Sequence, residues 1–280
     1  MNLSDLIARF RDPPPVVPVL RFDGVIGPRQ WRGAVSLASH ANALDRAFAM
    51  KRAAAVAIIV NSPGGSPVQS SLLYRRVRQL ADEKRLPVFA FAEDVAASGG
   101  YWLALAGDEV YADETSLLGS IGVVSSGFGF ARLIDRLGVE RRLHTAGENK
   151  TLLDPFLPER ERDVERLEAL QGDIHAAFKD HVKRRRVGKI DATDEALFSG
   201  EVMTGRMALS KGLIDGIGDL RAVMRARFGE RVRLVPVASE RRRRWWFARA
   251  ARGVEAHGLG FIAELVDWLE ARLLWARFGL

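Results

Sequence analysis

Two uninterrupted apolar segments constrain the fold of this chain more than any other feature. The segments "AAAVAIIV" (53–60) and "PVFAFA" (87–92) have the length of strands, and such runs are typical of parallel strands buried on both faces. Between them, residues 68–84 carry apolar side chains at roughly helical spacing among charges, which predicts an amphipathic helix. The order strand, helix, strand predicts an α/β fold with a mainly parallel sheet.

The same alternation extends along most of the chain. After the stiff stretch Pro13–Pro15, the pattern predicts a first strand at 16–26 and a short helix at 42–50. Further along, the predicted strands are 108–112, 119–125 and 139–145, and the predicted helices are 98–106, 130–137 and 158–186. Neither an internal repeat nor a low-complexity segment interrupts this order.

Composition changes near the carboxyl end of the sequence. Residues 238–280 hold four of the six tryptophans, and Arg241–Arg244 precede two of them. We therefore divide the chain into a tail and linker (1–15), an α/β domain (16–237) and a basic, tryptophan-rich amphipathic extension (238–280). Arginines next to indoles suit an anionic bilayer surface, so we expect membrane contact through 241–280. Packing of this extension on a neighbouring subunit is the alternative.

The overall composition excludes several kinds of protein. With no cysteine, the chain has no thiolate nucleophile and no disulfide. No apolar run has the length of a signal peptide or of a spanning helix, so we expect a cytoplasmic protein, peripheral on the inner membrane surface if the extension binds lipid. Although 42 Lys+Arg outnumber 35 Asp+Glu, no nucleic-acid fold pattern accompanies the basic run. We expect no nucleic-acid partner, no metal and no cofactor.

The segment "EDVAASGGYW" (93–102) places Ser98 among alanines and glycines. Small neighbours permit a tight strand-to-helix turn, and they also leave room for a substrate backbone beside a nucleophilic serine at a helix start. A serine needs a base to be a nucleophile, and the G-x-S-x-G elbow is absent. Among the histidines, only His144 stands where a catalytic base could be.

Lys150, in "GENKTLLDPF", is the other candidate base. A lysine accepts a proton only when neutral, which requires desolvation or a cationic neighbour, and most lysines are exposed surface charges. A third feature, "NSPGG" (61–65), follows a buried strand with two glycines whose N–H groups suit an oxyanion. Taken alone, each of these features is also explained by an ordinary loop.

Together, "NSPGG", "AASGGYW", "GSIGV", "GENKTLLDPF" and "FSGEVMTGRMALSKGLIDGIGDL" follow one another in an order that closely resembles half-size bacterial signal peptide peptidase A proteins of peptidase family S49. The resemblance runs from about Val17 to Val237. It implies a Clp protease/crotonase-like α/β fold with repeated ββα units and a C-terminal helical extension. It also implies a serine endopeptidase that cleaves peptides, signal-peptide remnants or membrane-protein segments.

The resemblance assigns roles residue by residue. Ser98 would be the nucleophile and Lys150 the general base of a Ser/Lys dyad, with the amides of Gly65 and Gly99 as the oxyanion hole and Ser120 orienting the lysine amine. The lysine of one subunit would complete the site of its neighbour in a homo-oligomeric ring. Two alternatives remain: a crotonase-like acyl-CoA enzyme, which would need acidic residues in the cleft, and a catalytically silent membrane scaffold.

Overall fold

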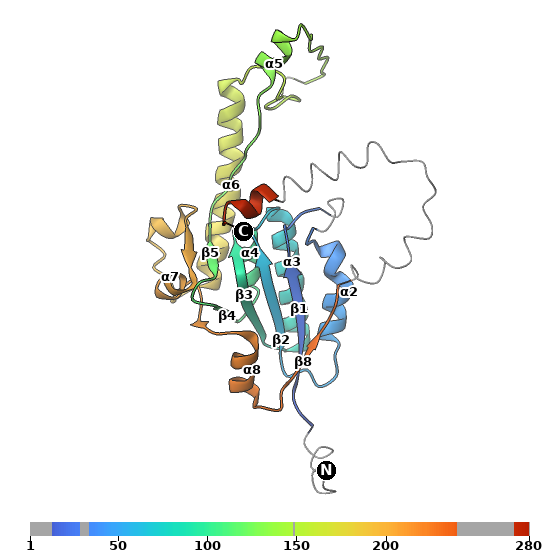
Figure 1. The fold of residues 1–280 in the computed structure, drawn as a ribbon, viewed down its shortest axis with the longest axis vertical. Coiled ribbons are helices and arrows are strands. Elements are labelled where there is room, and N and C mark those ends of the chain that lie inside the picture. The colour runs from blue at the N-terminus through green and yellow to red at the C-terminus, as the bar shows by residue number, and fades with distance from the viewer. Residues whose placement is uncertain (1–12, 29–33, 148, 240–271, 280) are drawn as a thin grey trace, which may run out of the picture.

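A single mainly parallel sheet forms the centre of the molecule (Figure 1). The computed structural model describes residues 13–28, 34–147, 149–239 and 272–279. The sheet has the strand order β6-β5-β3-β2-β1-β8, with β4 paired to β3 and β7 to β4, and within it only the β5–β6 pair is antiparallel. The strands are β1 (Val16–Asp23), β2 (Val56–Ser62), β3 (Val88–Ala97), β4 (Glu109–Ala112), β5 (Leu117–Gly119), β6 (Val202–Thr204), β7 (Gly216–Ile217) and β8 (Arg233–Pro236).

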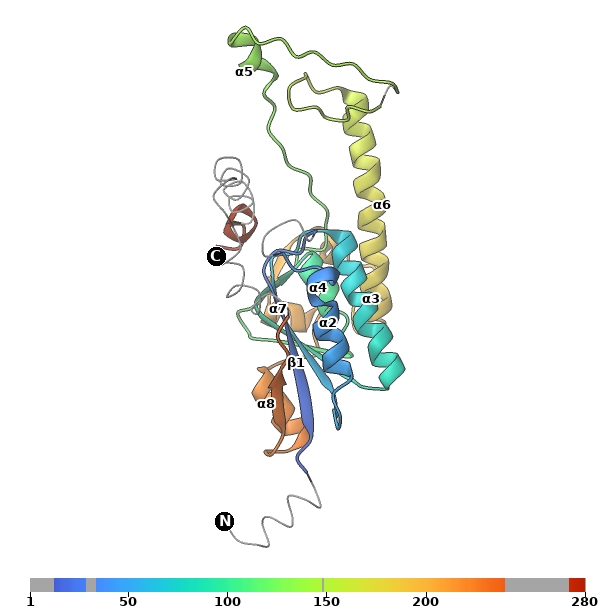
Figure 2. The same cartoon turned by 90° about the vertical axis from the view of Figure 1, so that its right-hand side faces the viewer.

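Helices pack on both faces of this sheet (Figure 2). The helices named in Figure 1 and elsewhere in the described chain are α2 (Leu37–Phe48), α3 (Pro67–Lys84), α4 (Gly99–Ala104), α5 (Ala131–Arg136), α6 (Glu161–Arg185), α7 (Gly205–Ser210) and α8 (Leu220–Phe228), with a 3-10 turn at Glu195–Phe198, and of these α5 lies away from the sheet. The first helix begins at Leu37, earlier than predicted, because Ser36 and Ser39 form a capping box that satisfies its free N–H groups.

The apolar runs lie in the sheet because both faces are buried. Along β2, Val56, Ile58 and Val60 contact the core beneath α2, α3 and α4, whereas Ala55 and Ala57 belong to the core under α8. Successive strand side chains point to opposite faces, so a strand covered on both faces must be apolar at every position. The predicted fold class is confirmed, and so is the strand–helix alternation through residue 112. The predicted strand at 119–125 is wrong, because β5 ends at Gly119 and residues 120–125 form no strand.

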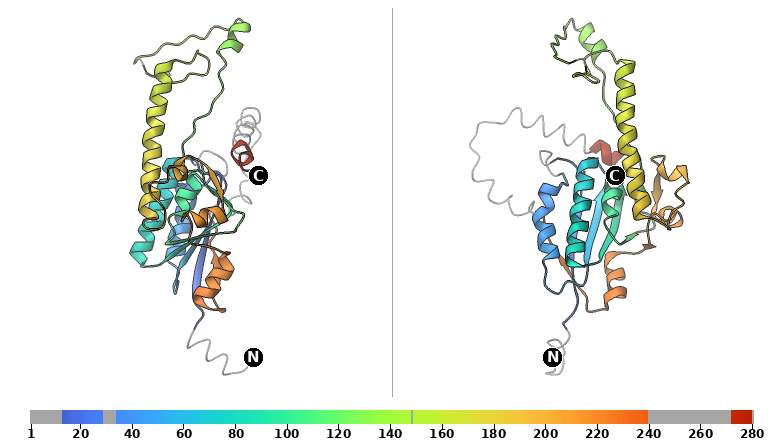
Figure 3. Two further views of the ribbon diagram at one scale, coloured as in Figure 1. Left: turned by 90° about the vertical axis from the view of Figure 1, so that its left-hand side faces the viewer. Right: turned by 180° about the vertical axis from the view of Figure 1, so that it is seen from behind.

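Residues 122–160, which we call the arm, leave the body and return to it at α6 (Figures 1 and 3). The predicted helix near 130–137 is present as α5, but the predicted strand at 139–145 is wrong, because this segment has no regular structure. Its residues are exposed, and no neighbouring strand within the described part of the chain offers hydrogen bonds to its backbone. Strand propensity without a pairing partner does not make a strand.

An ion pair joins the end of α6 to the β4 region of the sheet. Asp215 accepts from Arg186 Nη1 at 2.7 Å, from Lys189 Nζ at 2.5 Å and from the backbone N–H of Val110 at 2.8 Å. Burial alone would raise the pKa of Asp215, but the hydrogen bonds from Arg186, Lys189 and Val110 outweigh it and lower that pKa. The Arg186 side chain is only 2% exposed. Its buried positive charge is therefore compensated by the Asp215 carboxylate rather than by water.

Changing Asp215→Asn is expected to lower the free energy of unfolding by about 3–5 kcal/mol, the usual cost of leaving a buried charge without its partner. Urea denaturation followed by circular dichroism measures the change. The matched control is Glu114→Gln, which breaks the exposed pair between Glu114 and Arg206 and should cost less than about 1 kcal/mol. Equal losses in the two variants would contradict a special role for the buried pair.

The described residues contain no helix that is both long and apolar enough to cross a membrane. Most of the extension, residues 240–271, lies outside the described residues, so membrane contact through 241–280 stays a prediction, as do the domain limits 1–15, 16–237 and 238–280.

Candidate active site

The predicted site residues gather where three neighbouring strands end. Gly65 follows β2, Ser98 follows β3 and Ser120 follows β5, and these strands are adjacent in the order β5-β3-β2. Carboxyl ends of parallel strands meet at one edge of a sheet, the usual place for a ligand in such folds. The backbone N–H of Ser98 donates to the carbonyl of Gly119 at 2.8 Å, which connects two of these strand ends directly.

Ser98 occupies a strained turn between β3 and α4. Its φ of 51° and ψ of −121° lie outside the regions that L-residues normally populate. Such strain persists only when surrounding contacts impose it, and it clusters at functional sites. The serine hydroxyl makes no capping hydrogen bond to the helix that it precedes, and the residue is half-buried. The turn therefore presents an unbonded hydroxyl at the edge of the sheet.

The small residues around Ser98 are required by close backbone packing. A Cβ on Gly64 would lie 2.8 Å from the Cβ of Ser98, and one on Gly65, whose φ is +132°, would lie 2.0 Å from the carbonyl oxygen of Ile26. A Cβ on Gly99 would meet the hydroxyl of Ser70 at 2.4 Å and the amide nitrogen of Gly65 at 3.4 Å. The glycines thus bring the Gly65 and Gly99 backbones together beside the serine.

The amides of Gly65 and Gly99 remain available as donors. Neither N–H donates a hydrogen bond within the described part of the chain. The residues on either side of Gly65 form the hydrogen bonds with Ile26. The Ile26 N–H donates to the carbonyl of Gly64, and the Ser66 N–H donates to the carbonyl of Ile26. Gly99 is the first residue of α4, where helix N–H groups lack an internal acceptor.

Ser120 is held in a second strained position, with φ at 49°. Its backbone N–H donates to the carbonyl of Glu201 at 2.7 Å, and its carbonyl accepts from Gly122 at 2.9 Å. The residue is 8% exposed, and within the described residues no group pairs with its hydroxyl, which leaves this hydroxyl free to bind a further group.

One pocket of about 650 Å³ contains Gly65, Ser98 and Ser120. Its walls are mostly apolar, with Val123 and Val124 from the start of the arm and Leu167, Leu170 and Ile174 from α6. Leu274 and Arg277, from the short helix at 272–276 and the turn that follows it, complete the lining. No Asp or Glu is among the residues that line it. Gly99 is buried next to Ser98 and is not itself part of the lining.

Lys150 is not part of this pocket. It is exposed in the arm, and its neighbour Asn149 accepts a hydrogen bond from Arg162 at the start of α6. The Ser120 region contacts α6 much further along, where His175 Nε2 lies 3.1 Å from the carbonyl of Ile121. These two points on α6 are 13 residues apart, about 20 Å along the helix axis. One protomer therefore brings Ser98, Gly65, Gly99 and Ser120 together but leaves Lys150 far away.

Neither His144 nor His181 is placed to act as a base for Ser98. His144 is exposed in the arm. His181, on α6, is 2% exposed and stacks on Trp102 with ring centroids 4.7 Å apart, while its Nε2 lies 3.2 Å from the Trp102 carbonyl. Since Trp102 N–H donates to the carbonyl of Ser98, this ring supports the helix behind the serine. Tyr101 and Trp102 pack in the core.

Burial lowers the pKa of His181 from its ordinary value of 6.5 to about 4, although the hydrogen bond with Trp102 opposes this shift. Between these values the unfolded chain binds a proton that the folded chain does not, so stability is full above pH 6.5 and falls as the pH decreases to about 4. The expected loss is up to about 3 kcal/mol. Urea denaturation at pH 7.5 and pH 4.5 measures it.

The matched variants are His181→Gln, which keeps an N–H donor but does not titrate, and His144→Gln, the same change at an exposed position. The first should make the unfolding free energy clearly less dependent on pH in this range, and the second should leave the dependence as it is in the parent chain. An unchanged dependence in His181→Gln would show that other groups cause it.

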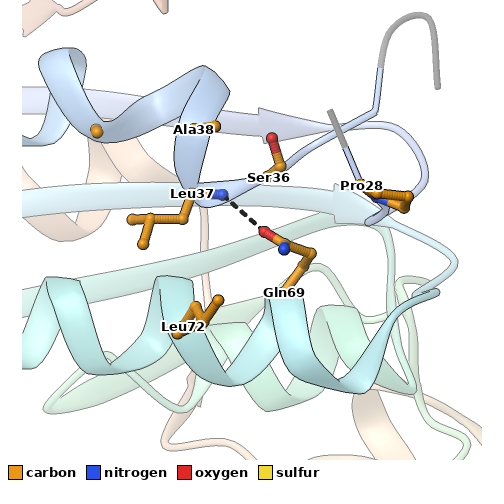
Figure 4. Close-up of a pocket in the computed structure, with 7 residues that line it drawn as sticks. Pro28, Ser36, Leu37, Ala38, Gln69 and Leu72 are labelled. Carbon is orange, nitrogen blue, oxygen red and sulfur yellow. Dashed lines mark hydrogen bonds between the residues drawn. The ribbon is translucent and has the colours of Figure 1, made fainter. Parts of the chain in front are cut away.

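A second pocket, of about 660 Å³, opens between α2 and α3 (Figure 4). The Leu37 backbone N–H donates to the side-chain oxygen of Gln69 at 3.1 Å inside it. The other lining residues are Pro28, Ser36, Ala38, Ala41 and Leu72, none of which is ionisable. This pocket holds none of the predicted site residues.

Sequence reasoning did not identify the pocket walls on α6 and at 272–277. Leu170 and Ile174 are exposed by 54% and 37%, and on a charge-rich helix they resemble ordinary surface positions. Their spacing of four residues on one helix face was the available signal.

The chain has the α/β fold of the Clp protease/crotonase class. At the edge of the sheet where β2, β3 and β5 end, it holds a strained serine beside two glycine amides that donate no hydrogen bond within the described residues. A solved membrane-bound stomatin-specific protease with a substrate peptide has this fold, with a TM-score of 0.50 and 16% identity over 82% of this chain and 94% of that one. The chain belongs to peptidase family S49, whose family model matches residues 80–231.

Several curated proteins are similar in sequence. A Na(+)/H(+) antiporter NhaA of Brucella abortus is 50% identical over 97% of this chain, which spans 38% of that protein. A chloroplastic serine protease SPPA of Arabidopsis thaliana is 36% identical over 61% of this chain and 25% of its own length. A putative signal peptide peptidase SppA of Enterococcus faecium is 30% identical over 58% of this chain and 47% of its own length. The chain thus spans less than half of each of these relatives.

Proposed function

We propose that this chain is a serine endopeptidase in which Ser98 is the nucleophile and Lys150 of a neighbouring subunit is the general base. The observation that carries the proposal is the unbonded hydroxyl of Ser98, held in a strained turn beside the free amides of Gly65 and Gly99. A nucleophile next to two preorganised N–H donors is the arrangement that acyl transfer requires.

In the proposed reaction, the Ser98 hydroxyl transfers its proton to the neutral Lys150 amine as its oxygen attacks the peptide carbonyl. The N–H groups of Gly65 and Gly99 stabilise the resulting oxyanion, and the start of α4 adds a favourable helix dipole. The ammonium group then returns the proton to the leaving amine, and an acyl-enzyme remains. Water, deprotonated by the same lysine, hydrolyses this ester and regenerates the serine.

Two features support a lysine donated by a second subunit. Lys150 is exposed and outside the pocket, in a loop that contacts α6 about 20 Å along the helix from the Ile121 contact, and the arm that carries it exposes many apolar side chains. Exposed apolar groups in one contiguous segment are typical of a protein–protein interface. The exposed apolar residues of the arm are Val124, Phe128, Phe130, Leu133, Leu137, Val139, Leu143, Leu152 and Phe156.

We propose that Ser120 orients the lysine amine when it arrives. Its hydroxyl has no partner within the described residues and lines the pocket that contains Ser98. A hydroxyl can accept a hydrogen bond from an ammonium and donate to a neutral amine, so it serves both states of the base. Burial of the amine by substrate and neighbouring subunit would favour its neutral form.

The proposed substrates are apolar peptides, such as signal-peptide remnants or segments of membrane proteins. The walls formed by Val123, Val124, Leu167, Leu170 and Ile174 favour apolar side chains next to the scissile bond. The absence of Asp and Glu from the lining residues argues against the crotonase-like alternative. The strained Ser98 argues against a silent scaffold, which would not need that strain.

Cleavage of fluorogenic peptides with apolar residues on both sides of the scissile bond tests the proposal. A fluorophosphonate should inactivate the chain, and mass spectrometry should locate it on Ser98. An assembled chain that neither cleaves these peptides nor reacts at Ser98 would contradict the proposal.

A further inference from the structure

The described residues 272–279, which we call the strap, lie against the pocket that contains Ser98. The strap consists of a helix at 272–276 and a turn at 277–279, in which Phe278 N–H donates to Trp275 and Gly279 N–H donates to Ala276. Leu274 and Arg277 line the same pocket as Ser98 and Ser120. In Figure 1 the strap, drawn in red, lies at the end of the sheet toward which β3 and β5 point.

The strap has one side that is apolar and more buried, and Leu274 on that side lines the pocket. Leu274, Trp275 and Phe278 are half-buried, whereas Leu273 is 61% exposed. A helix of this length is not stable by itself in water, so it depends on the surface on which it packs. The apolar α6 residues Leu170 and Ile174 line the same pocket as Leu274.

No hydrogen bond or ion pair joins the strap to the rest of the described chain. Arg277, at the rim of the pocket, has no carboxylate partner among these residues. The contact is therefore an apolar one without directional bonds, which another apolar segment can replace. Leu274 and Arg277 line the same pocket as the apolar walls that we expect to bind substrate side chains.

We infer that the strap is an intramolecular inhibitor that covers the Ser98 pocket and competes with peptide substrates. The strap and the pocket belong to the same chain, and binding between two parts of one chain can correspond to an effective concentration on the order of millimolar. A weak contact is then enough to close a large fraction of the sites, yet substrate binding can still displace it. Part of this inference rests on the proposed function, because competition with substrate requires that the pocket is a peptidase site.

Because the sequence has no cysteine, a thiol placed in the pocket reports access without any catalysis. The parent for this experiment is the full chain with Ser98→Cys, and the measured quantity is the rate of modification by N-ethylmaleimide, followed by mass spectrometry. The double change Leu274→Asp and Phe278→Asp puts carboxylates on the apolar side of the strap. We expect it to raise the modification rate by about threefold or more, since an effective concentration of about twice the dissociation constant or higher leaves about two thirds or more of the sites covered.

The matched control is Leu273→Asp, the same chemical change on the outward side of the strap, which should leave the rate as in the parent. Circular dichroism checks that all chains are folded. Equal rates in the parent, the double variant and the control would overturn the inference, and so would a faster rate in the control alone.

The same strap substitutions in the chain with Ser98 intact test competition. The double variant should lower the apparent KM for a fluorogenic peptide by about threefold or more, as removal of a competing segment requires. Faster thiol modification without any peptide cleavage would support the strap but refute the proposed function. Cleavage with unchanged KM and an unchanged thiol rate would refute the strap and leave the peptidase proposal standing.

Discussion

Replacing Ser98 with alanine is expected to lower kcat/KM for peptide cleavage by about 10⁴-fold or more, the range seen when a hydrolase loses its nucleophile. The hydroxyl oxygen forms the covalent intermediate, and no other group in the pocket can replace it. The only other serines that line the pocket are Ser120, Ser125 and Ser199. Initial rates on a fluorogenic apolar peptide measure the loss, with light scattering to verify assembly.

The matched control is Ser125→Ala, because Ser125 lines the same pocket but is exposed near the start of the arm. That variant should keep its rate within a few-fold of the parent chain. The structure of Ser98→Ala should be intact, since alanine relieves none of the contacts that impose the turn, and its thermal unfolding should show this. Cleavage by Ser98→Ala at the parental rate would assign the chemistry to another group.

Mixing two inactive variants, Ser98→Ala and Lys150→Ala, is expected to restore activity if each site takes its lysine from a neighbour. Lys150→Ala alone should lose about 10²–10⁴-fold, the usual contribution of a general base. In a ring with head-to-tail contacts, a functional site needs the serine of one variant next to the lysine of the other. Random assembly of equal amounts then gives about a quarter of the parental sites.

Co-expression with two different affinity tags, followed by tandem purification, isolates the mixed assemblies for this test. Assemblies that carry one variant under both tags are the control, and they should stay inactive. Mixed assemblies without recovered activity would contradict a shared site and favour a lysine that reaches its own serine after a large movement of the arm. Full activity in Lys150→Ala would make His144, also in the arm, the next candidate base.

Most of the core could be predicted from the sequence because the pattern of apolar residues within a short segment is enough to indicate a buried strand. The run 53–60 is apolar at every position, so it had to be buried on both faces, and the structure places it as β2 in the middle of the sheet. Elements outside the core were predicted less well. The segment 139–145 has strand propensity but lies exposed in the arm, where no described strand pairs with it.

The candidate site also has a part that the sequence predicts and a part that it does not. Ser98, Gly65, Gly99 and Ser120 follow strands that are neighbours in the sheet, so the strand order brings them to one edge. Lys150 belongs to the arm, whose position depends on contacts with α6 such as that between Asn149 and Arg162. Strand order follows from general rules of parallel sheets, but no local pattern specifies the course of a long exposed segment.

By itself, the sequence determined the class of fold, the positions of the reactive side chains and the need for glycine around Ser98, because apolar periodicity and backbone sterics act over a few residues. Only the tertiary structure decided that the loop of Lys150 contacts α6 about 20 Å along the helix from the point where α6 contacts Ile121, and that residues 272–279 lie against the serine pocket. Both facts depend on contacts between segments far apart in the chain. Such contacts are set by the sum of many weak packing interactions, and no short stretch of sequence encodes that sum.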